Sequence, residues 1–589
     1  MKRKILAAAL ACALLAGCGP VRTEPADSES APADEPEIAY APLDDRPDNE
    51  ERVVYLADSL GYELLLPEKD DYRTRLDGQP RNENGTAYGD RADLYEWVLA
   101  REAAGCDRYI LSVDQLLSGG LVSSRSLTGE NPVTLSDGRT LTESELLAEL
   151  LETLAADPDN QVWLLDTVMR LAATAGYGGF GLNEYDALRA YGMAPRPHLE
   201  GDALTVDNIV ADYPLGSDGQ VLAVESEEPL PEGAAADYLA ARERKLRLSD
   251  DLFDALEGTE GRFHVLVGID DSSEEDSIQK NEIAYLRSLL RPGDALLSGV
   301  DDLAFKAVAR LYLDECGWQG AKVSVTYFGG TEDQPACAYD YQPLTAIVAE
   351  HFAFFGLEAA EAGAEELRVL VLTQPADETQ KSGYIQDLIR ALNGEDTPTV
   401  LIDAGNGTYG TVFHQALTEQ AELGGLLSYA GFLDMAIVTG TALSHGVARY
   451  AFLQRGEAAE ATERAFLRTL ADSVLKDFCY KNVVRGDILA FVQGELGGSG
   501  DNFWTPDIDR AAVLARLETG MDAAAADVIA NLERSNFRSA LGEDGLLGWG
   551  GVALENYRFP WDRAFEIGMD IRLGAFTDPH AEILGIYYR

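Results

Sequence analysis

Short apolar runs alternate with longer segments of helical period from residue 38 to about residue 443. Each predicted strand is an apolar run bounded by turn residues, and each predicted helix carries apolar residues three and four positions apart. This alternation is typical of an α/β domain with a mainly parallel sheet. The predicted strands are Ile38–Leu43, Tyr62–Leu66, Tyr109–Val113, Val162–Val168, Phe263–Ile269, Lys322–Phe328, Leu367–Leu372, Val400–Ile402 and Leu426–Tyr429. The predicted helices are Ala92–Ala103, Glu143–Ala155, Ala234–Leu256, Ser277–Leu290, Asp302–Leu313 and Leu344–Phe354.

The number of strands bears on the architecture. Nine predicted strands slightly overfill a (β/α)8 barrel, so we expect a barrel-like, mainly parallel sheet with one strand outside it. A doubly wound open sheet is the alternative. No glycine-rich phosphate loop follows the first strand, which argues against a nucleotide-binding version of that alternative.

The pattern changes in three places. Pro132–Thr142 holds Ser136-Asp137-Gly138 between two β-prone runs, which predicts a hairpin. Gly201–Glu232 is acidic and rich in turn residues, which predicts a surface excursion. After about residue 444 the segments Glu457–Phe478, Ile508–Leu517 and Ala523–Leu532 have helical period. We therefore expect an α/β domain over residues 38–443 and a mainly helical region over residues 444–589.

The N-terminus has the features of a lipoprotein signal. Lys2, Arg3 and Lys4 precede the apolar run Ile5–Leu15, which is too short to span a bilayer, and Ala16-Gly17 leave room for a peptidase to cut before Cys18. Residues 1–17 are thus predicted to be removed and Cys18 to carry lipid, which places the protein outside the cytoplasm of a bacterium, anchored to its membrane. An ordinary secretory signal with an accidental cysteine is the alternative.

The segment that follows the signal differs from the rest of the chain. Residues 18–37 are rich in Pro, Ala, Ser, Asp and Glu, and they lack the apolar content needed for packing. They are predicted to form a disordered tether between the lipid and the folded domain. Beyond the signal, no apolar stretch is long enough to cross a bilayer, so the lipid on Cys18 is the expected contact with the membrane.

Charge narrows the choice of partners. The chain of 589 residues has 101 acidic and 47 basic side chains, a formal net charge of −54. A nucleic-acid-binding protein needs a cationic surface, so nucleic acid is not an expected partner. Broad contact with anionic lipid is disfavoured for the same reason. A solvated acidic exterior explains this charge, and recruitment of cations or basic partners is the alternative interpretation.

Cysteine and histidine spacing gives no support for a metal or redox centre. Apart from Cys12 in the signal and the lipidated cysteine, four cysteines are scattered without any CxxC spacing, and the six histidines have no metal-ligand spacing. The spacing permits a disulfide between Cys316 and Cys337 but does not determine it. No Gly-x-Ser-x-Gly elbow is present, so serine hydrolysis is not expected either. We expect neither a metal nor an organic cofactor.

Acidic side chains follow several of the predicted strands. In a parallel α/β fold the carboxyl ends of the strands converge on one face, where reactive groups gather. Asp270-Asp271 follows the apolar run Phe263–Ile269, so this pair is expected to enter a partly desolvated site in which one carboxyl is protonated while the other stays charged. Glycosidic cleavage requires that division of roles between two carboxyl groups. Asp270 and Asp271 are therefore the predicted catalytic pair.

Helix capping is the competing interpretation of this pair. Ser272 and Glu275 have the spacing of a capping box, and acids favour the positive end of a helix dipole. Asp301-Asp302 precedes another predicted helix and is interpreted as a cap.

Other residues at the predicted strand ends are candidates for binding substrate. Pro42 and Pro47 hold Asp44-Asp45-Arg46 extended, so that Arg46 either grips a hydroxyl-rich or anionic substrate or closes an internal ion pair. Glycines beside Asp403 and Asn406 permit close approach of a ligand, although a tight turn explains them as well. The predicted substrate-binding residues are Asp45, Arg46, Asp114, Arg170, Asp403 and Asn406.

Several segments resemble an uncharacterised family of bacterial, often secreted proteins that begins with Pro-Leu-Asp-Asp-Arg-Pro. The matching pieces are short but collinear over nearly the whole mature chain. They are Pro42–Pro47, Leu111–Asp114, Gly119–Arg125, Val168–Arg170, Ala241–Leu246, Gly268–Asp271 and Pro560-Trp561. The resemblance implies no activity, because the family has no assigned function.

The chain departs from that family pattern after the last predicted strand. Where the pattern resembles Tyr-Ala-Gly-Trp-Asn-Thr followed by another Asn, this chain has Tyr429-Ala430-Gly431-Phe432-Leu433-Asp434, and the later polar position is apolar. The departure removes two amide side chains from the expected pocket, so this member either binds a different ligand or has lost activity.

A second resemblance concerns the acidic pair. An Asp-Asp pair after a buried strand is similar to that of the β-N-acetylglucosaminidases that work by substrate assistance. That likeness implies that Asp270 orients an acetamido group and that Asp271 is the acid/base.

Three functions are carried forward. The first is a surface-tethered glycoside hydrolase that acts on an extracytoplasmic saccharide or another small polar substrate. The second is a non-catalytic carbohydrate-binding or envelope-associated lipoprotein. The third is hydrolysis of a phosphate or amide by a carboxylate-bound metal, which has no support from ligand spacing.

Overall fold

The computed structural model describes residues 35–127, 132–174, 182–394, 397–456, 458–499, 503, 505, 507–541 and 545–576. The predicted signal peptide, Cys18 and the tether up to residue 34 lie outside the described residues. The fold is α/β, as predicted, and all its strands longer than three residues, apart from two near the C-terminus, belong to two parallel sheets.

The first parallel sheet has six strands in the order β2-β1-β3-β6-β7-β8. Its strands are β1 (Glu37–Ala41), β2 (Glu63–Leu65), β3 (Arg108–Ser112), β6 (Gln161–Val168), β7 (Phe263–Ile269) and β8 (Ala295–Ser298). The second has five strands in the order β10-β9-β11-β12-β13. They are β9 (Ala321–Phe328), β10 (Leu357–Ala359), β11 (Leu367–Leu372), β12 (Thr399–Asp403) and β13 (Leu426–Gly431).

These strand orders correct the expected barrel. A closed (β/α)8 barrel is not found in the described part of the chain, because the nine predicted strands are divided between two open sheets. In each sheet the strand that comes first in the sequence stands second in the strand order. The next strand in the sequence lies on one side of it, and all later strands are added on the other side. This is the strand order of doubly wound α/β sheets. In such sheets ligands bind at the carboxyl ends of the strands.

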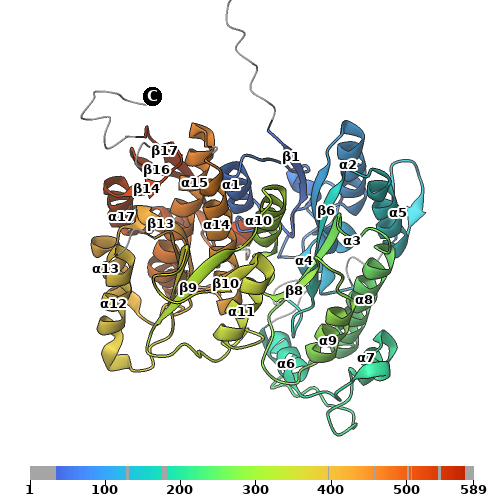
Figure 1. Cartoon of the computed structure of the whole chain (residues 1–589). Coiled ribbons are helices and arrows are strands. Elements are labelled where there is room, and N and C mark those ends of the chain that lie inside the picture. Colours follow the sequence, from blue (N-terminus) through green and yellow to red (C-terminus); the bar gives the residue numbers. More distant parts are fainter. Residues whose placement is uncertain are drawn as a thin grey trace, which may run out of the picture. The chain divides into compact units, whose positions relative to one another are not determined.

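A layer of helices separates the two sheets. Helices α1 (Glu51–Ser59), α10 (Leu303–Glu315), α11 (Leu344–Phe355) and α14 (Met435–Arg455) lie in this layer. Figure 1 shows α10 and α14 between the sheets, and one apolar core joins alternate residues of both sheets to these helices. The domain boundary expected at residue 444 falls inside α14.

Further helices cover the outer faces of the sheets. The outer face of the first sheet packs against α2 (Arg91–Ala104), α3 (Val113–Ser118), α5 (Glu143–Ala156), α8 (Ala234–Ala255) and α9 (Gln279–Leu289). The outer face of the second packs against α12 (Lys381–Gly394) and α13 (Gly410–Gln420). The shorter helices α4 (Leu121–Ser124), α6 (Leu182–Met193) and α7 (Val206–Asp212) lie in the long connections of the first sheet.

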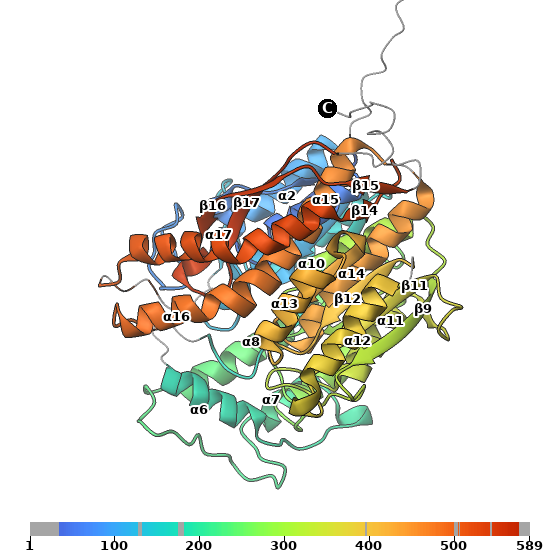
Figure 2. The same cartoon turned by 90° about the vertical axis from the view of Figure 1, so that its left-hand side faces the viewer.

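The chain after α14 is helical, as predicted, but it also contains strands. Its helices are α15 (Glu460–Ser473), the π-helix Val474–Val484, α16 (Arg485–Gly494) and α17 (Arg510–Arg534). Two small antiparallel pairs follow, β14 (Asn536–Arg538) with β15 (Leu546–Gly548) and β16 (Val552–Arg558) with β17 (Gly568–Leu573). Figure 2 shows α16 and α17 running beside each other at the edge of this unit.

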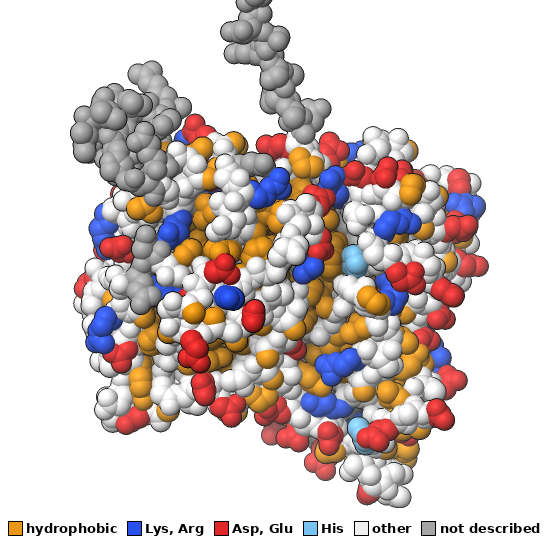
Figure 3. Space-filling model, viewed as in Figure 1, with side chains coloured by type: hydrophobic (Ala, Val, Ile, Leu, Met, Phe, Trp, Pro, Cys, Tyr) orange, Lys and Arg blue, Asp and Glu red, His pale blue; other side chains and the backbone are white. Residues whose placement is uncertain are grey.

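Three smaller features bear on the sequence predictions. The hairpin expected within residues 132–142 is present as β4 (Val133–Thr134) and β5 (Thr140–Leu141). The four described cysteines, Cys316 and Cys337 among them, are free thiols. No helix in the described ranges has both the length and the apolar character of a membrane span. Acidic side chains are spread over the face in Figure 3 and do not gather in one patch.

The close packing of α10 against α14 gives a testable prediction. A Cβ on Gly440 would overlap Oδ2 of Asp302 and lie 2.6 Å from Cε of Lys306, and these two side chains form a fully buried ion pair. We expect Gly440→Ala to reduce the free energy of unfolding by about 1–3 kcal/mol, because the core has no room for the methyl group. Thermal unfolding measures this change.

Gly486→Ala is the matched control. Gly486 also lies in a helix, and a Cβ there would have no atom within 4 Å. That substitution should leave Tm unchanged or slightly higher, because Ala is the better helix former. Equal Tm values for the two variants would contradict the packing argument.

Candidate functional site

A cavity of about 430 Å³ lies at the carboxyl ends of strands from both sheets. Residues that follow β1, β6, β7 and β8 line one side, and residues that follow β9 and β13 line another. The C-terminal segment 560–566 contributes the remaining wall. The charged and aromatic residues that line the whole cavity are Arg46, Arg125, Arg170, Asp270, Asp271, Asp301, Asp340, Asp434, Arg485, Arg563, Glu566, Tyr185, Tyr339, Tyr341, Trp561 and Phe565.

The predicted catalytic pair lies in this cavity. Asp270 pairs with Arg125 at 2.5 Å, and its Oδ1 accepts the backbone N–H of Asp271 at 2.9 Å. Asp271 forms an ion pair with Arg170, and Arg170 also donates to the hydroxyl of Tyr185 at 3.1 Å. Burial raises the pKa of Asp271, while the charge of Arg170 opposes that rise. Each carboxyl of the pair is thus matched to its own arginine.

Capping does not explain these residues. Helix α9 begins at Gln279, eight residues beyond Asp271, and its N-cap makes no side-chain hydrogen bond. The capping box expected from Ser272 and Glu275 is therefore not formed. Asp302 precedes α10 but makes no capping hydrogen bond, and it pairs with Lys306 at 2.7 Å instead.

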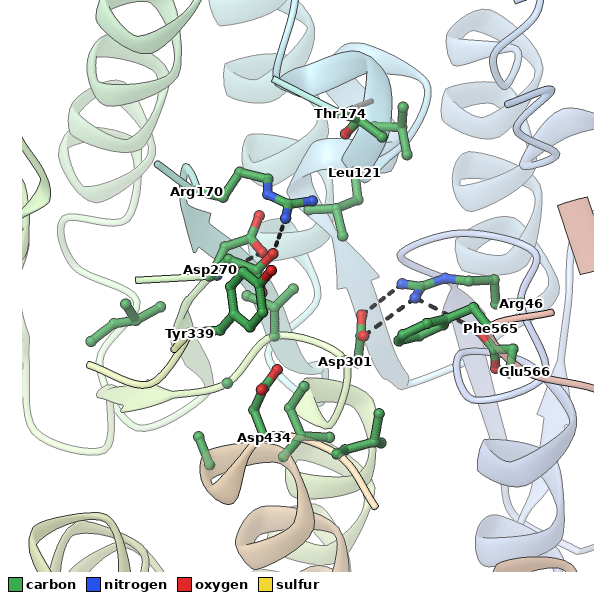
Figure 4. A pocket seen from close by; sticks show the side chains of 18 of the residues that line it. Arg46, Leu121, Arg170, Thr174, Asp270, Asp301, Tyr339, Asp434, Phe565 and Glu566 are labelled. Carbon is green, nitrogen blue, oxygen red and sulfur yellow. Dashed lines mark hydrogen bonds and ion pairs between the residues drawn. The ribbon is translucent and has the colours of Figure 1, made fainter. Parts of the chain in front are cut away.

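Arg46 is held by carboxylates on both sides. It donates to Asp44 at 2.8 Å and to the two oxygens of Asp301 at 2.6 and 3.2 Å, as Figure 4 shows for Asp301. Its guanidinium also lies 4.8 Å from the ring centroid of Trp561. Of the two interpretations of Arg46, the geometry favours the internal ion pair, because most of its donors are already in use.

Asp45 supports the site from outside the cavity. Its Oδ1 accepts the backbone N–H of Thr74 at 3.1 Å and Nε1–H of Trp561 at 2.8 Å. This contact joins the loop after β1 to a residue more than 500 positions later in the chain. Asp45 therefore positions the C-terminal wall of the cavity.

Three further predicted substrate-binding residues do not line the cavity. Asp114 is buried on the outer side of the first sheet, where it binds Lys245 and accepts from the hydroxyl of Thr167 at 2.6 Å. Asp403 accepts from the backbone N–H of Gly405 at 3.0 Å and is buried, which raises its pKa to about 7. Asn406 is exposed and left-handed, with φ of 46°. These contacts give the three residues local structural roles.

Asp434 is the carboxyl that the strand-end argument missed. It occupies the N-cap position of α14 without making a capping hydrogen bond. Burial, with the charges of Asp271, Asp340 and Asp301, raises its pKa to about 8. In Figure 4 its carboxyl points towards the side of the cavity that carries Asp270 and Arg170. Its place just after the predicted strand Leu426–Tyr429 is the signal that marks it in the sequence.

Strained backbone occurs in the cavity lining and next to it. Five described non-glycine residues have left-handed φ values, and Trp561 and Asp562, at 56° and 49°, lie in the C-terminal wall. Phe432, at 59°, lies two residues before Asp434. Such conformations cost about 1–3 kcal/mol each and cluster at functional sites. This supports the cavity as the functional site of the protein.

The carboxyl groups of the cavity do not form a metal centre. Across the described ranges, no group of three or more His, Cys, Asp or Glu side chains has the geometry to hold a metal ion. The acids are instead interleaved with arginines, an arrangement suited to a polar ligand with hydroxyl groups.

Comparison with known proteins gives one match. Residues 38–570 match a family described as "Protein of unknown function (DUF4127)". No curated protein and no solved structure matches the chain.

Proposed function

We propose that this chain, which belongs to the DUF4127 family of proteins of unknown function, is a glycoside hydrolase-like lipoprotein acting on an extracytoplasmic saccharide. The predicted lipid on Cys18 would hold it at the bacterial membrane. The observation that carries this proposal is that one cavity holds both Asp434, which forms no ion pair among the described residues, and Asp271, which is paired with Arg170.

The two roles fall to Asp434 and Asp271. With a pKa of about 8, Asp434 carries a proton at pH 7 and can donate it to the leaving oxygen. Burial raises the pKa of Asp271, and the charge of Arg170 beside it opposes that rise. We assign Asp271, the acid paired with an arginine, the role of the carboxylate that activates water or attacks the sugar. This assignment moves the proton donor from Asp271, where the resemblance to β-N-acetylglucosaminidases placed it, to Asp434. Asp270 accepts the backbone N–H of Asp271 and so positions that carboxyl group.

The rest of the wall suits a sugar. Tyr185, Tyr339, Tyr341 and Trp561 supply apolar ring faces, and the neighbouring arginines supply hydrogen-bond donors. A saccharide presents both an apolar face and a rim of hydroxyl groups, so both kinds of side chain have a partner. The cavity has the volume of a small-ligand site.

A non-catalytic binding protein is the second candidate. The observation that favours it is that Asp270, Asp271 and Asp301 each pair with an arginine. Ion pairs of this kind lower the tendency of a carboxyl to exchange protons. A protein of this type would bind saccharides without cleaving them.

Chromogenic aryl glycosides distinguish the two candidates. We expect the wild-type protein to release the chromophore from at least one aryl glycoside, and Asp271→Asn to reduce kcat by at least about 10²-fold, because the amide can neither attack nor act as a base. Asp387→Asn, an exposed acid on α12, is the control and should keep full activity. Saccharide binding without release of chromophore would favour the second candidate, and full activity of Asp271→Asn would remove that residue from the mechanism.

A further inference from the structure

Glu566 is a buried carboxyl that lacks hydrogen-bond partners in the described part of the chain. It is 2% exposed and lies in the C-terminal wall of the cavity. Neither of its oxygens has a hydrogen-bond partner among the residues that the structure describes. Its nearest cation is Arg46, with 3.7 Å between Nη1 and Oε1, and Figure 4 shows Asp301 and Arg46 between Glu566 and Asp434.

Another buried glutamate, Glu463, makes the hydrogen bonds that Glu566 lacks. Glu463 is also buried beside an arginine, but its oxygens accept from Arg449 at 3.1 and 2.5 Å. Arg46 cannot make the same hydrogen bonds to Glu566, because it already donates to Asp44 and Asp301. An unpaired buried polar group destabilises a fold by about 1–3 kcal/mol, so its presence calls for an explanation. A ligand that completes its hydrogen bonds would supply one.

We infer that Glu566 and Trp561 form a ligand-binding subsite, in which Glu566 hydrogen-bonds a hydroxyl group of the bound saccharide. This inference rests on the proposed function, since it names a second contact of the same cavity. The subsite lies away from Asp434 and Asp271, so it acts on binding and not on the bond that breaks.

The chemistry of the subsite matches a hydroxyl group. Burial and the charge of Asp48 raise the pKa of Glu566 to about 8, against the opposing charges of Arg46 and Lys481. Asp301 also faces Glu566 and adds to the rise. A protonated carboxyl donates one hydrogen bond and accepts another, which is the capacity of a sugar hydroxyl. The ring of Trp561, fixed by its bond to Asp45, offers an apolar surface beside it.

Glu566→Met in the full chain tests the inference. Methionine fills a similar volume without a polar group, so we expect a higher Tm in the absence of ligand. The probes are the methyl glycosides of glucose, galactose and N-acetylglucosamine. Any of them that the wild type binds should bind the variant at least tenfold more weakly. Tryptophan fluorescence measures the binding. For any aryl glycoside that is cleaved, KM should rise at least tenfold while kcat changes less. Glu566→Gln keeps one donor and one acceptor, so its affinity should stay within about threefold of wild type.

Glu463→Met is the matched control for stability. It leaves Arg449 buried without its partner, so its Tm should fall. A fall of the same size in Glu566→Met would assign Glu566 a structural role and overturn the inference, as would unchanged affinity in that variant. If Glu566→Met cleaved an aryl glycoside with the KM of the wild type, the subsite alone would be overturned. Binding that depends on Glu566 but without cleavage would overturn hydrolysis alone, and the absence of both binding and cleavage in the wild type would overturn both.

Discussion

Asp434→Asn is expected to reduce the hydrolysis of alkyl glycosides by about 10²–10⁴-fold, the usual contribution of a general acid. The amide keeps the size of the side chain and cannot donate a proton to a leaving alcohol. Substrate binding should change little, because the asparagine side chain still fits the N-cap position of α14. Steady-state kinetics should therefore show a fall in kcat with a nearly constant KM.

The leaving group provides an internal check on this assignment. An aryl leaving group of low pKa needs little protonation, so the variant should lose less activity on a nitrophenyl glycoside than on an alkyl glycoside. The Asp387→Asn variant again serves as the control on an exposed acid. If Asp434→Asn had the wild-type rate on both substrates, Asp434 would not be the proton donor.

Asp434 also makes stability depend on pH in a definite direction. Its pKa is about 8 in the folded protein and about 3.8 in the unfolded chain, so the folded protein holds a proton that the unfolded chain releases between these values. Its contribution to stability is complete below pH 4 and is lost as the pH rises to about 8. Asp434→Asn removes this pH-dependent contribution to stability. The Tm of the variant should therefore fall less than the Tm of the wild type between pH 5 and pH 8. Parallel Tm curves would contradict the raised pKa.

The elements of the fold were largely predictable from sequence, but their pairing was not. Apolar runs of strand length located nine strands of the two parallel sheets, and within those sheets only the short edge strands β8 and β10 were missed. The antiparallel strands β14 to β17 near the C-terminus were not predicted either. Periodicity shows where a strand lies and not which strand it pairs with. Helix α10 leaves the first sheet after β8 and leads into β9 of the second, and nothing in its local pattern distinguishes it from a helix that returns to the same sheet.

The candidate site was predictable in part, for a similar reason. The carboxyl-end rule brought Arg46, Arg170 and the Asp270-Asp271 pair to one cavity. Asp114 also follows a strand, but it lies in α3 and binds Lys245 of α8 on the outer side of the sheet. The C-terminal wall was beyond prediction, because segment 560–566 reaches the cavity through tertiary packing that no local pattern describes.

The largest effect on stability is expected at Lys245, the partner of that misassigned Asp114. Its ammonium group lies between Asp114 and Asp166, 2.6 Å from Asp166, and all three side chains are almost fully buried. Lys245→Met leaves two buried carboxylates facing each other without a cation. Breaking a buried ion pair in this way costs about 3–5 kcal/mol, so we expect a large fall in Tm or a loss of soluble protein.

Restoring charge balance should reverse most of that loss. Adding Asp114→Asn and Asp166→Asn to Lys245→Met removes both unpaired charges, and replacing a buried ion network by neutral groups is often nearly neutral for stability. The triple variant should therefore melt well above Lys245→Met alone. Lys322→Met, an exposed lysine on β9, controls for the loss of a lysine and should leave Tm within about 1 °C. If the triple variant were no more stable than Lys245→Met, the loss would come from packing of the lysine stem, and the buried charges would not be its cause.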